Sequence, residues 1–409
     1  MSRTACLATV ALGLLLVSPD ASADPLTDIE AYAPELSGEP KFRMAKACHD
    51  TERDVFGVIA VWRVHFGIDF DVVRYLRVEG DAGSPDYGAV IDDIPLTAEF
   101  RVDHVDCASD GQNIYVTYDR RYVDPRWYRI DGTSVSPPYE VTPPPCDGRK
   151  GAGGWDLHTH LPRIAFADTP EGPRVAVAVA VKDWISDVGS SSACAEQFDA
   201  NTGTPLVSTV FWAESGISRE YDLEWNGDRF LWAVEYDDDG VGPPEVNFHE
   251  SITFDLGGAE RSRHRIETFI PATSVQPNQM VWSADHETMF WQTARRTYWL
   301  DAEGANMGAI NNVVGDRVAA CDYRGSNGHV ATSFGQGFVY LGSFPWGMFF
   351  SATIRGWFDP SPGPAAAVNT GSTAFYPEAC SSSDDEVLLV SRPQGGNDAF
   401  IYTGMESID

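Results

Sequence analysis

Two short stretches of the sequence hold residue types that bind metal ions. In WDLHTH, residues 155–160, His158 and His160 are two residues apart, so both side chains lie on one side if the segment is an extended strand. Imidazole and carboxylate groups bind Zn²⁺ and similar ions, and Asp156 or His249 would be the further ligand. A hydrogen-bonding role without a metal explains the pair as well, and both interpretations stay open.

The second stretch is acidic. Residues 235–241 read EYDDDGV, and its carboxylates are ligands of the kind that Ca²⁺ prefers. The stretch lacks the distal glutamate of an EF-hand loop, and a solvated acidic turn is the alternative. We therefore take Asp237 and Asp239 as candidate calcium ligands and expect no other cofactor.

Catalytic motifs of known spacing are missing from the sequence. It contains no GxSxG, HExxH or Walker motif, and no GxGxxG in a suitable context. Asp69 and Asp71 in GIDFD have no base or nucleophile beside them, so we predict that both are surface residues. A carboxylate pair for glycoside hydrolysis is defined by its separation in space, so the sequence leaves that chemistry open.

Aromatic residues in the long loops complete the candidate ligand-binding set. Tryptophan side chains stack on sugars or anchor a protein partner, although they also pack beneath loops. The candidate set is Trp155, Asp156, His158, His160, Trp184 and Trp346.

The charge of the chain argues against binding to nucleic acid. The formal net charge is −31, and the lysines are only Lys41, Lys46, Lys150 and Lys182. Binding to a polyanion depends on Lys and Arg side chains that neutralise phosphates. Solubility in a saline or extracellular setting explains the acidity, and binding of Ca²⁺ or a cationic partner is the alternative.

The first 23 residues have the features of a cleavable secretory signal. Arg3 precedes an apolar run, and ASA ends at Ala23, where we place the cleavage. The run is too short to span a membrane with these flanks, and no later segment is apolar over about 18 residues. We expect a secreted or periplasmic protein that does not insert into a membrane.

The cysteines agree with export. Of the seven, Cys6 leaves with the signal, and an even number remains. In an exported chain disulfides are the default state, with fifteen possible pairings of six cysteines. The remaining cysteines are Cys48, Cys107, Cys146, Cys194, Cys321 and Cys380.

A repeated pattern along the chain predicts the fold. A short strand, a turn of Gly, Asp, Asn or Ser and an apolar strand recur in HVDCASDGQNIYV, LEWNGDRFLWAV, YPEACSSSDDEVLLV and similar copies, with a weaker first copy in MAKACHDTERDVFGVIAV. A second turn signal follows each copy, as in RIDGTS, FDLGGA, YLGS and IYTG. The copies predict seven units, and two-residue alternation occurs throughout them.

Repeated units with two hairpins are typical of β-propellers, and the chain resembles this superfamily over residues 24–409. The resemblance implies one all-β domain, a seven-bladed β-propeller, with six or eight blades as alternatives. The last copy ends at Gly404 with little chain to follow, so we predict that residues 25–34 add the outer strand of the last blade and close the ring.

The propeller arrangement restricts the cysteine pairing. Cys48, Cys107, Cys321 and Cys380 each lie just before the first turn of a unit, in units that are consecutive once the ring closes. Only neighbouring inner strands bring such Cα atoms within disulfide range. We predict Cys48–Cys107 with Cys321–Cys380, or alternatively Cys48–Cys380, and pair Cys146 with Cys194 by elimination.

The most suitable function for such a chain is binding. The long loops on one face suit a protein or glycan ligand, and we expect a monomeric, non-catalytic binding protein. The alternative is an exported hydrolase or lyase that acts on carbohydrate.

Overall fold

The computed structural model of the protein describes most of the chain after the N-terminal segment. The described residues are 28–120, 123–141, 157–183, 191–212, 217–238, 246–269, 279–283, 287–292, 296–311, 317–320, 329–337, 350–358, 363–369, 375–383, 386–393 and 400–407. The predicted signal, residues 1–23, lies outside them. Within the described part of the chain, no helix is long and apolar enough to cross a membrane.

The described residues form seven antiparallel sheets, which we call blades 1 to 7. Blade 1 consists of β2 (Lys41–Asp50), β3 (Val55–His65), β4 (Asp69–Glu79) and β5 (Val90–Glu99). Blade 2 consists of β6 (Val105–Ser109), β7 (Asn113–Arg120), β8 (Val123–Asp131) and β10 (Tyr139–Glu140), with β9 (Ser134–Val135) also paired to β8. Blade 3 consists of β11 (Leu157–Ala167), β12 (Arg174–Asp183), β13 (Ser191–Asp199) and β14 (Pro205–Trp212).

The remaining blades repeat this order. Blade 4 consists of β15 (Ile217–Trp225), β16 (Phe230–Asp238), β17 (Val246–Phe254) and β18 (Glu260–Phe269). Blade 5 consists of β19 (Gln279–Ser283), β20 (Thr288–Gln292), β21 (Arg296–Leu300) and β22 (Asn306–Asn311). Blade 6 consists of β23 (Arg317–Ala320), β24 (His329–Gly337), β25 (Phe350–Phe358) and β26 (Gly363–Asn369), and blade 7 of β27 (Phe375–Ser382), β28 (Glu386–Pro393), β29 (Ile401–Ser407) and β1 (Asp28–Tyr32).

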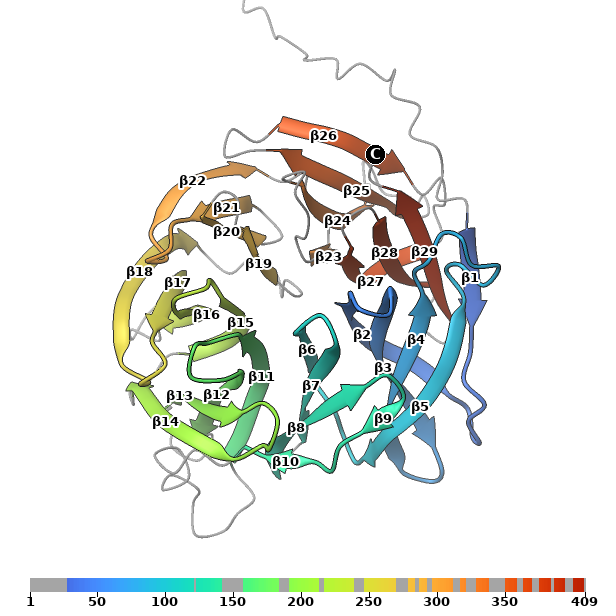
Figure 1. Ribbon diagram of the computed structural model, residues 1–409, viewed down its shortest axis with the longest axis horizontal. Helices are drawn as coiled ribbons and strands as arrows, with labels where there is room; N and C mark the ends of the chain where they lie inside the picture. Colours follow the sequence, from blue (N-terminus) through green and yellow to red (C-terminus); the bar gives the residue numbers. More distant parts are fainter. Residues whose placement is uncertain are drawn as a thin grey trace, which may run out of the picture.

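The blades stand in a ring around a common axis (Figure 1). The first strand of each blade is innermost and contacts the first strand of the next blade, from β2 through β27 and back to β2. The number of sheets in the described residues equals the number of repeat units in the sequence.

An N-terminal strand closes the ring, as the sequence predicts. β1 pairs with β29 in antiparallel register, with Asp28 opposite Met405 and Tyr32 opposite Ile401. Figure 1 shows β1 and β29 side by side although they come from opposite ends of the chain. Because β1 supplies the fourth strand of blade 7, the edge of β29 is covered.

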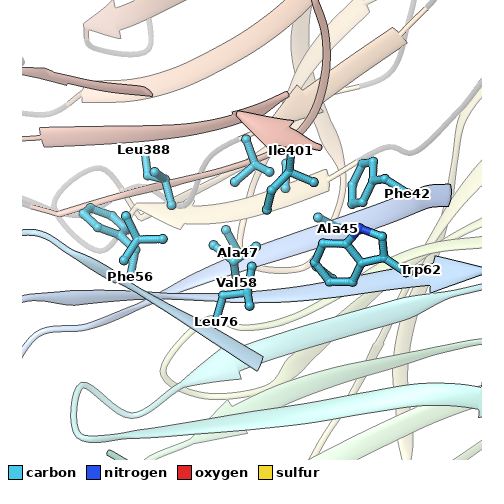
Figure 2. Close-up of a cluster of buried hydrophobic side chains, with 13 residues drawn as sticks. Phe42, Ala45, Ala47, Phe56, Val58, Trp62, Leu76, Leu388 and Ile401 are labelled. Carbon is cyan, nitrogen blue, oxygen red and sulfur yellow. The ribbon is translucent and has the colours of Figure 1, made fainter. Parts of the chain in front are cut away.

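Packing between blades explains why strands such as β3, the second strand of blade 1, are so apolar. Along β3, Phe56, Val58 and Trp62 pack toward blade 7, whereas Ile59 and Val61 pack toward blade 2. Successive side chains of a strand point to opposite faces, so a strand buried on both faces is apolar at almost every position. Figure 2 shows the cluster between blades 1 and 7, where Phe42, Trp62 and Leu76 meet Leu388 and Ile401.

The first predicted disulfide is present. Cys48 and Cys107 are bonded, with their Cα atoms 6.2 Å apart. Both cysteines, and Cys380, lie two residues before the last paired residue of the first hairpin in their blade. Because Cys48 is bonded to Cys107, the alternative Cys48–Cys380 bond is wrong.

For each of the other two predicted disulfides, the structure describes only one of the two cysteines. Cys194 in β13 is also disulfide-bonded. Its predicted partner Cys146 and the predicted partner of Cys380, Cys321, lie outside the described residues.

One of the predicted second turns is wrong. IYTG, residues 401–404, lies within β29. A single Gly beside Thr is a weak turn signal. Another predicted turn, YLGS at residues 340–343, lies outside the described residues.

Candidate functional site

The strand directions give the ring two distinct ends. Connections between the first and second and between the third and fourth strands share one end, which we call the turn end. Connections between the second and third strands and between consecutive blades share the other, which we call the loop end. The sequence predicts long loops at residues 142–160, 182–197, 235–250 and 342–364. These ranges overlap the connections from β10 to β11, β12 to β13, β16 to β17 and β24 to β25, which belong to the loop end. Within the last range, residues 350–358 form the strand β25.

The sequence-predicted binding residues fall on these connections or at the strand ends beside them. His158 and His160 belong to β11, and Asp237 belongs to β16, so these three are strand residues and not loop residues. The strands extend beyond the predicted loop boundaries because pairing continues to His158 opposite Lys182 and Asp237 opposite Asn247. The other members of the predicted set lie outside the described residues: Trp155, Asp156, Trp184, Trp346 and Asp239.

One proposed companion of the histidine pair lies elsewhere. His249 is in β17, the third strand of blade 4, and its ring packs 5.1 Å from the ring of Trp291 in blade 5. Its place as a metal ligand beside His158 and His160 stays a prediction. No cluster of three or more metal-ligating side chains occurs among the residues that the structure describes.

A charged cluster that the sequence did not reveal lies on the inner strands. Four consecutive blades each contribute one residue, with alternating charge: Lys46, Asp106, Arg163 and Asp222. The Lys46 ammonium lies 3.2 Å from Asp106 Oδ1. We call these four residues the axial cluster.

The two carboxylates of the axial cluster also tie blades together. Asp106 Oδ2 accepts a 3.1 Å hydrogen bond from the backbone N–H of Ile164 in blade 3. Asp222 Oδ2 accepts a 2.5 Å hydrogen bond from the backbone N–H of Met280 in blade 5. Each aspartate sits three residues before the last paired residue of its hairpin and bonds to the next inner strand.

Burial perturbs the ionisable groups near the axis. Loss of solvent raises the pKa of the Asp222 carboxyl to about 6, although Lys46 opposes the shift. Burial alone lowers the pKa of the Lys46 ammonium, but Asp106 and Asp222 outweigh it and raise the pKa. Burial and the nearby cations Arg163 and Lys46 hold the pKa of His104 well below its ordinary value. The cluster therefore holds balanced charges in a poorly solvated place.

A second ionic network lies at the loop end of blade 1, where Asp71 is fully buried. Its carboxylate accepts hydrogen bonds from Arg43 at 2.6 Å, from Arg63 at 2.9 Å and from the backbone N–H of Val102 at 2.9 Å. The prediction that Asp71 is a surface residue is therefore wrong. Both arginines come from other strands, so no local pattern signals the burial.

The segment leading into blade 2 is fixed by a further carboxylate. Asp119 Oδ1 accepts hydrogen bonds from the backbone N–H groups of Asp103 and His104, at 2.7 and 2.6 Å. Burial raises the pKa of Asp119 to about 7 despite these bonds. Asp71 and Asp119 together hold three consecutive backbone N–H groups, those of residues 102 to 104.

Comparison with known proteins identifies the architecture. No protein-family model matches the sequence, and the search of curated proteins gives no match. Among solved structures, the WD40 domain of Neurospora crassa Pan2 is 8% identical, with 94% of this chain and 97% of that chain covered and a TM-score of 0.50. BBS1N in complex with ARL6DN is 8% identical, with 93% and 96% covered and a TM-score of 0.50.

A puromycin hydrolase structure is also similar. It is 13% identical, with 86% of this chain covered and a TM-score of 0.49, and the present chain spans 50% of its length. The ring of four- and five-stranded sheets and the two full-length structural matches show that the chain is a β-propeller.

Proposed function

We propose that this propeller is an exported, non-catalytic binding protein that presents its loop end to a protein partner. The observation that carries the proposal is the position of the two longest connections. Residues 141–156, from β10 to β11, and residues 338–349, from β24 to β25, both join strands at the loop end. The longest turn-end connection, residues 80–89 between β4 and β5, is shorter than either. A rigid scaffold with variable connections at one end is a common design for binding proteins.

The carboxylates of the axial cluster support a non-catalytic role because their contacts with neighbouring blades explain why they are present. Asp106 and Asp222 each accept a backbone N–H from the next blade, and Asp106 also faces Lys46. Such bonds hold inner strands together, which is a sufficient reason for buried carboxylates on the axis.

Export is supported by two features. Residues 1–23 have the composition of a secretory signal, and Cys48–Cys107 is a bond of the kind that persists in oxidising compartments. Cys194 is a third oxidised cysteine among the described residues.

An exported enzyme that acts on carbohydrate is the second candidate, and one observation favours it. Asp222 has a pKa raised to about 6 and shares the axial cluster with a second carboxylate, Asp106. A carboxylic acid with a raised pKa beside a second carboxylate is the general acid of glycoside hydrolysis.

A parallel screen of the purified mature protein tests the two candidates. The protein is applied to a displayed peptide library, to a glycan array and to a panel of chromogenic glycosides. Saturable binding to peptides without turnover supports the proposal. Glycoside turnover that is lost in Asp106→Asn or Asp222→Asn overturns it in favour of the enzyme, and binding only to glycans overturns the choice of a protein partner.

A further inference from the structure

Exposed large apolar side chains fall into two groups among the described residues. At the turn end, Ile91, Leu206 and Met307 lie singly, one each in blades 1, 3 and 5. At the loop end, the exposed residues gather on blade 1 and the adjoining end of blade 7. These are Phe66, Ile68, Phe100 and Phe400, with exposed fractions of 55, 53, 57 and 41%. Single exposed apolar residues are ordinary, whereas a group of them marks an interaction site.

The three blade 1 residues of the loop-end group lie beside the loop-end termini of β3, β4 and β5. Phe66 and Ile68 are in the turn between β3 and β4, and the Phe66 N–H donates to the Ile68 carbonyl at 3.0 Å. Phe70, the second residue of β4, lies opposite Val64 and packs edge-on against Phe100, with 6.5 Å between ring centres. We call Phe66, Ile68, Phe70 and Phe100 the apolar patch.

The patch rests on a fixed support. His65 and Asp69, at the base of the turn, are hydrogen-bonded at 2.8 Å. On the opposite face of the same strands, Arg63 pairs with the buried Asp71. A surface already held in shape loses little conformational entropy when a partner binds.

Acidic residues border the patch from the segment that joins β1 to β2. Gly38, at φ +95°, approaches so closely that a Cβ placed on it would lie 3.3 Å from Cζ of the Phe66 ring. Glu39 directly follows Gly38 and Glu35 lies three residues before it; both are exposed, and the described residues form no ion pair with either. The apolar patch is therefore bordered by two carboxylates that are available to a cation.

We propose that the apolar patch and the two glutamates bind a protein segment with an apolar anchor and flanking Lys or Arg residues. The anchor sits on Phe66, Ile68 and Phe100, and the cations pair with Glu35 and Glu39. This inference rests on the proposed function and names the partner class and its place on the loop end.

Charge complementarity selects this occupant over a second copy of the chain. The net charge of −31 makes two copies repel, whereas it attracts a basic partner over a distance of about 8–10 Å at physiological salt. Aromatic side chains at a site that excludes water supply most of the affinity of such interfaces.

The test uses the mature protein and short synthetic peptides in fluorescence anisotropy. Each peptide carries a central Phe and Leu, flanked by Lys and Arg, by Gly and Ser, or by Asp and Glu. The variants are Phe66→Ser/Phe100→Ser for the anchor and Glu35→Gln/Glu39→Gln for the charges. Leu206→Ser/Met307→Ser at the turn end is the matched control, and equal melting temperatures verify that all variants are folded.

We expect the wild type to bind the basic-flanked peptide most tightly. The anchor variant weakens binding about tenfold or more, as loss of a central aromatic contact does. The glutamate variant weakens binding of the basic-flanked peptide only, and the control binds like the wild type.

Four results overturn the inference. These are wild-type affinity in the anchor variant, equal binding of acidic-flanked peptides, no binding of any peptide, and a wild-type dimer in sedimentation that Phe66→Ser/Phe100→Ser abolishes. If peptides bind but the anchor variant is unaffected, the apolar patch is not the binding site, while the proposed function stands. Turnover of a glycoside contradicts the proposed function itself.

Discussion

Blade 1 contacts blade 7 mainly through apolar side chains, whereas its contact with blade 2 adds a disulfide and polar contacts at both ends of the strands. Hydrogen bonds from Tyr32 to Asp93 and from Thr403 to the Gly88 carbonyl lie beside the apolar contacts with blade 7. Toward blade 7, Trp62 and Phe42 belong to the cluster of Figure 2. Toward blade 2, an apolar cluster around Ile59 is supplemented by Cys48–Cys107.

The polar ties of the blade 1–2 junction reach both ends of the strands. At the turn end, Arg53 contacts Asp131 at 2.5 Å and the Gln112 carbonyl at 2.7 Å. At the loop end, Asp71 accepts the Val102 N–H. The blade 7–1 junction has β1 instead, which pairs with β29 while its Tyr32 hydroxyl bonds to Asp93 of blade 1. A strand that spans the closure thus takes the place of the polar ties.

Removal of the closing strand is expected to have the largest effect. A variant without residues 24–36 exposes the edge of β29 and removes Tyr32 and Leu36 from the blade 7–1 core. We expect aggregation and a loss of about 3 kcal/mol or more of stability. Size-exclusion chromatography and thermal unfolding measure both, and a monomeric variant with an unchanged melting temperature contradicts this closure.

The closing strand was predictable because the sequence repeats. The prediction took IYTG as the last turn of the repeat, although these residues lie within β29, and the strand that it assigned to residues 25–34 pairs with this same β29. The same repetition places Cys48 and Cys107 at equivalent positions on neighbouring inner strands, so their bond was also predictable.

Features that depend on several strands were not predictable from local patterns. Asp71 is buried because Arg43 and Arg63 reach it from other strands, and the axial cluster combines residues of four blades. A signal for part of the cluster was present, since Asp106 and Asp222 each sit just before an apolar residue at the same distance from the first turn. Asp237 and Asp238 fall in a loop predicted from the sequence, but both belong to β16. Their pairing with β17 overrides their low strand propensity.

The apolar character of the blade 7–1 junction is tested by Trp62→Ala. The side chain is fully buried, so its removal leaves a cavity and costs about 3–5 kcal/mol. Ile59→Ala, on the opposite face of the same strand, is the matched change toward blade 2 and costs about 2–5 kcal/mol. Urea unfolding measures both, and a loss below about 1 kcal/mol for Trp62→Ala contradicts the packing.

The covalent tie of the blade 1–2 junction contributes less. Cys48→Ala/Cys107→Ala opens a bond that spans 59 residues, for which we expect a loss of about 2–4 kcal/mol with the fold retained. Circular dichroism and thermal unfolding measure the change. Non-reducing peptide mapping of the wild type is the control, and free thiols at both positions contradict the bond.

The remaining expected effect is a pH dependence that arises at the blade 1–2 junction. The pKa of Asp119 is raised to about 7 in the folded protein, above its value of about 3.9 in an unfolded chain. The unfolded state therefore loses this proton first, and the contribution of Asp119 to stability is complete below about pH 4 and lost as the pH rises to about 7.

Comparison with Asp119→Asn isolates this contribution. The amide oxygen still accepts the Asp103 and His104 N–H groups but carries no charge. We expect the variant to gain stability relative to the wild type between about pH 4 and 7, with a constant difference outside that window. Urea midpoints across the pH range measure it, and a difference that is independent of pH contradicts the assigned burial.

Closure of the ring by β1 is tested most directly by hydrogen exchange with peptide-level mass spectrometry. The peptides to follow cover residues 28–32 and 401–405, with residues 386–393 of β28 as the internal reference. The account predicts that β1 and the edge of β29 are protected together, and that reduction of Cys48–Cys107 leaves this protection in place. Complete exchange of residues 28–32 at the rate of an unstructured peptide, with β28 still protected, would contradict it.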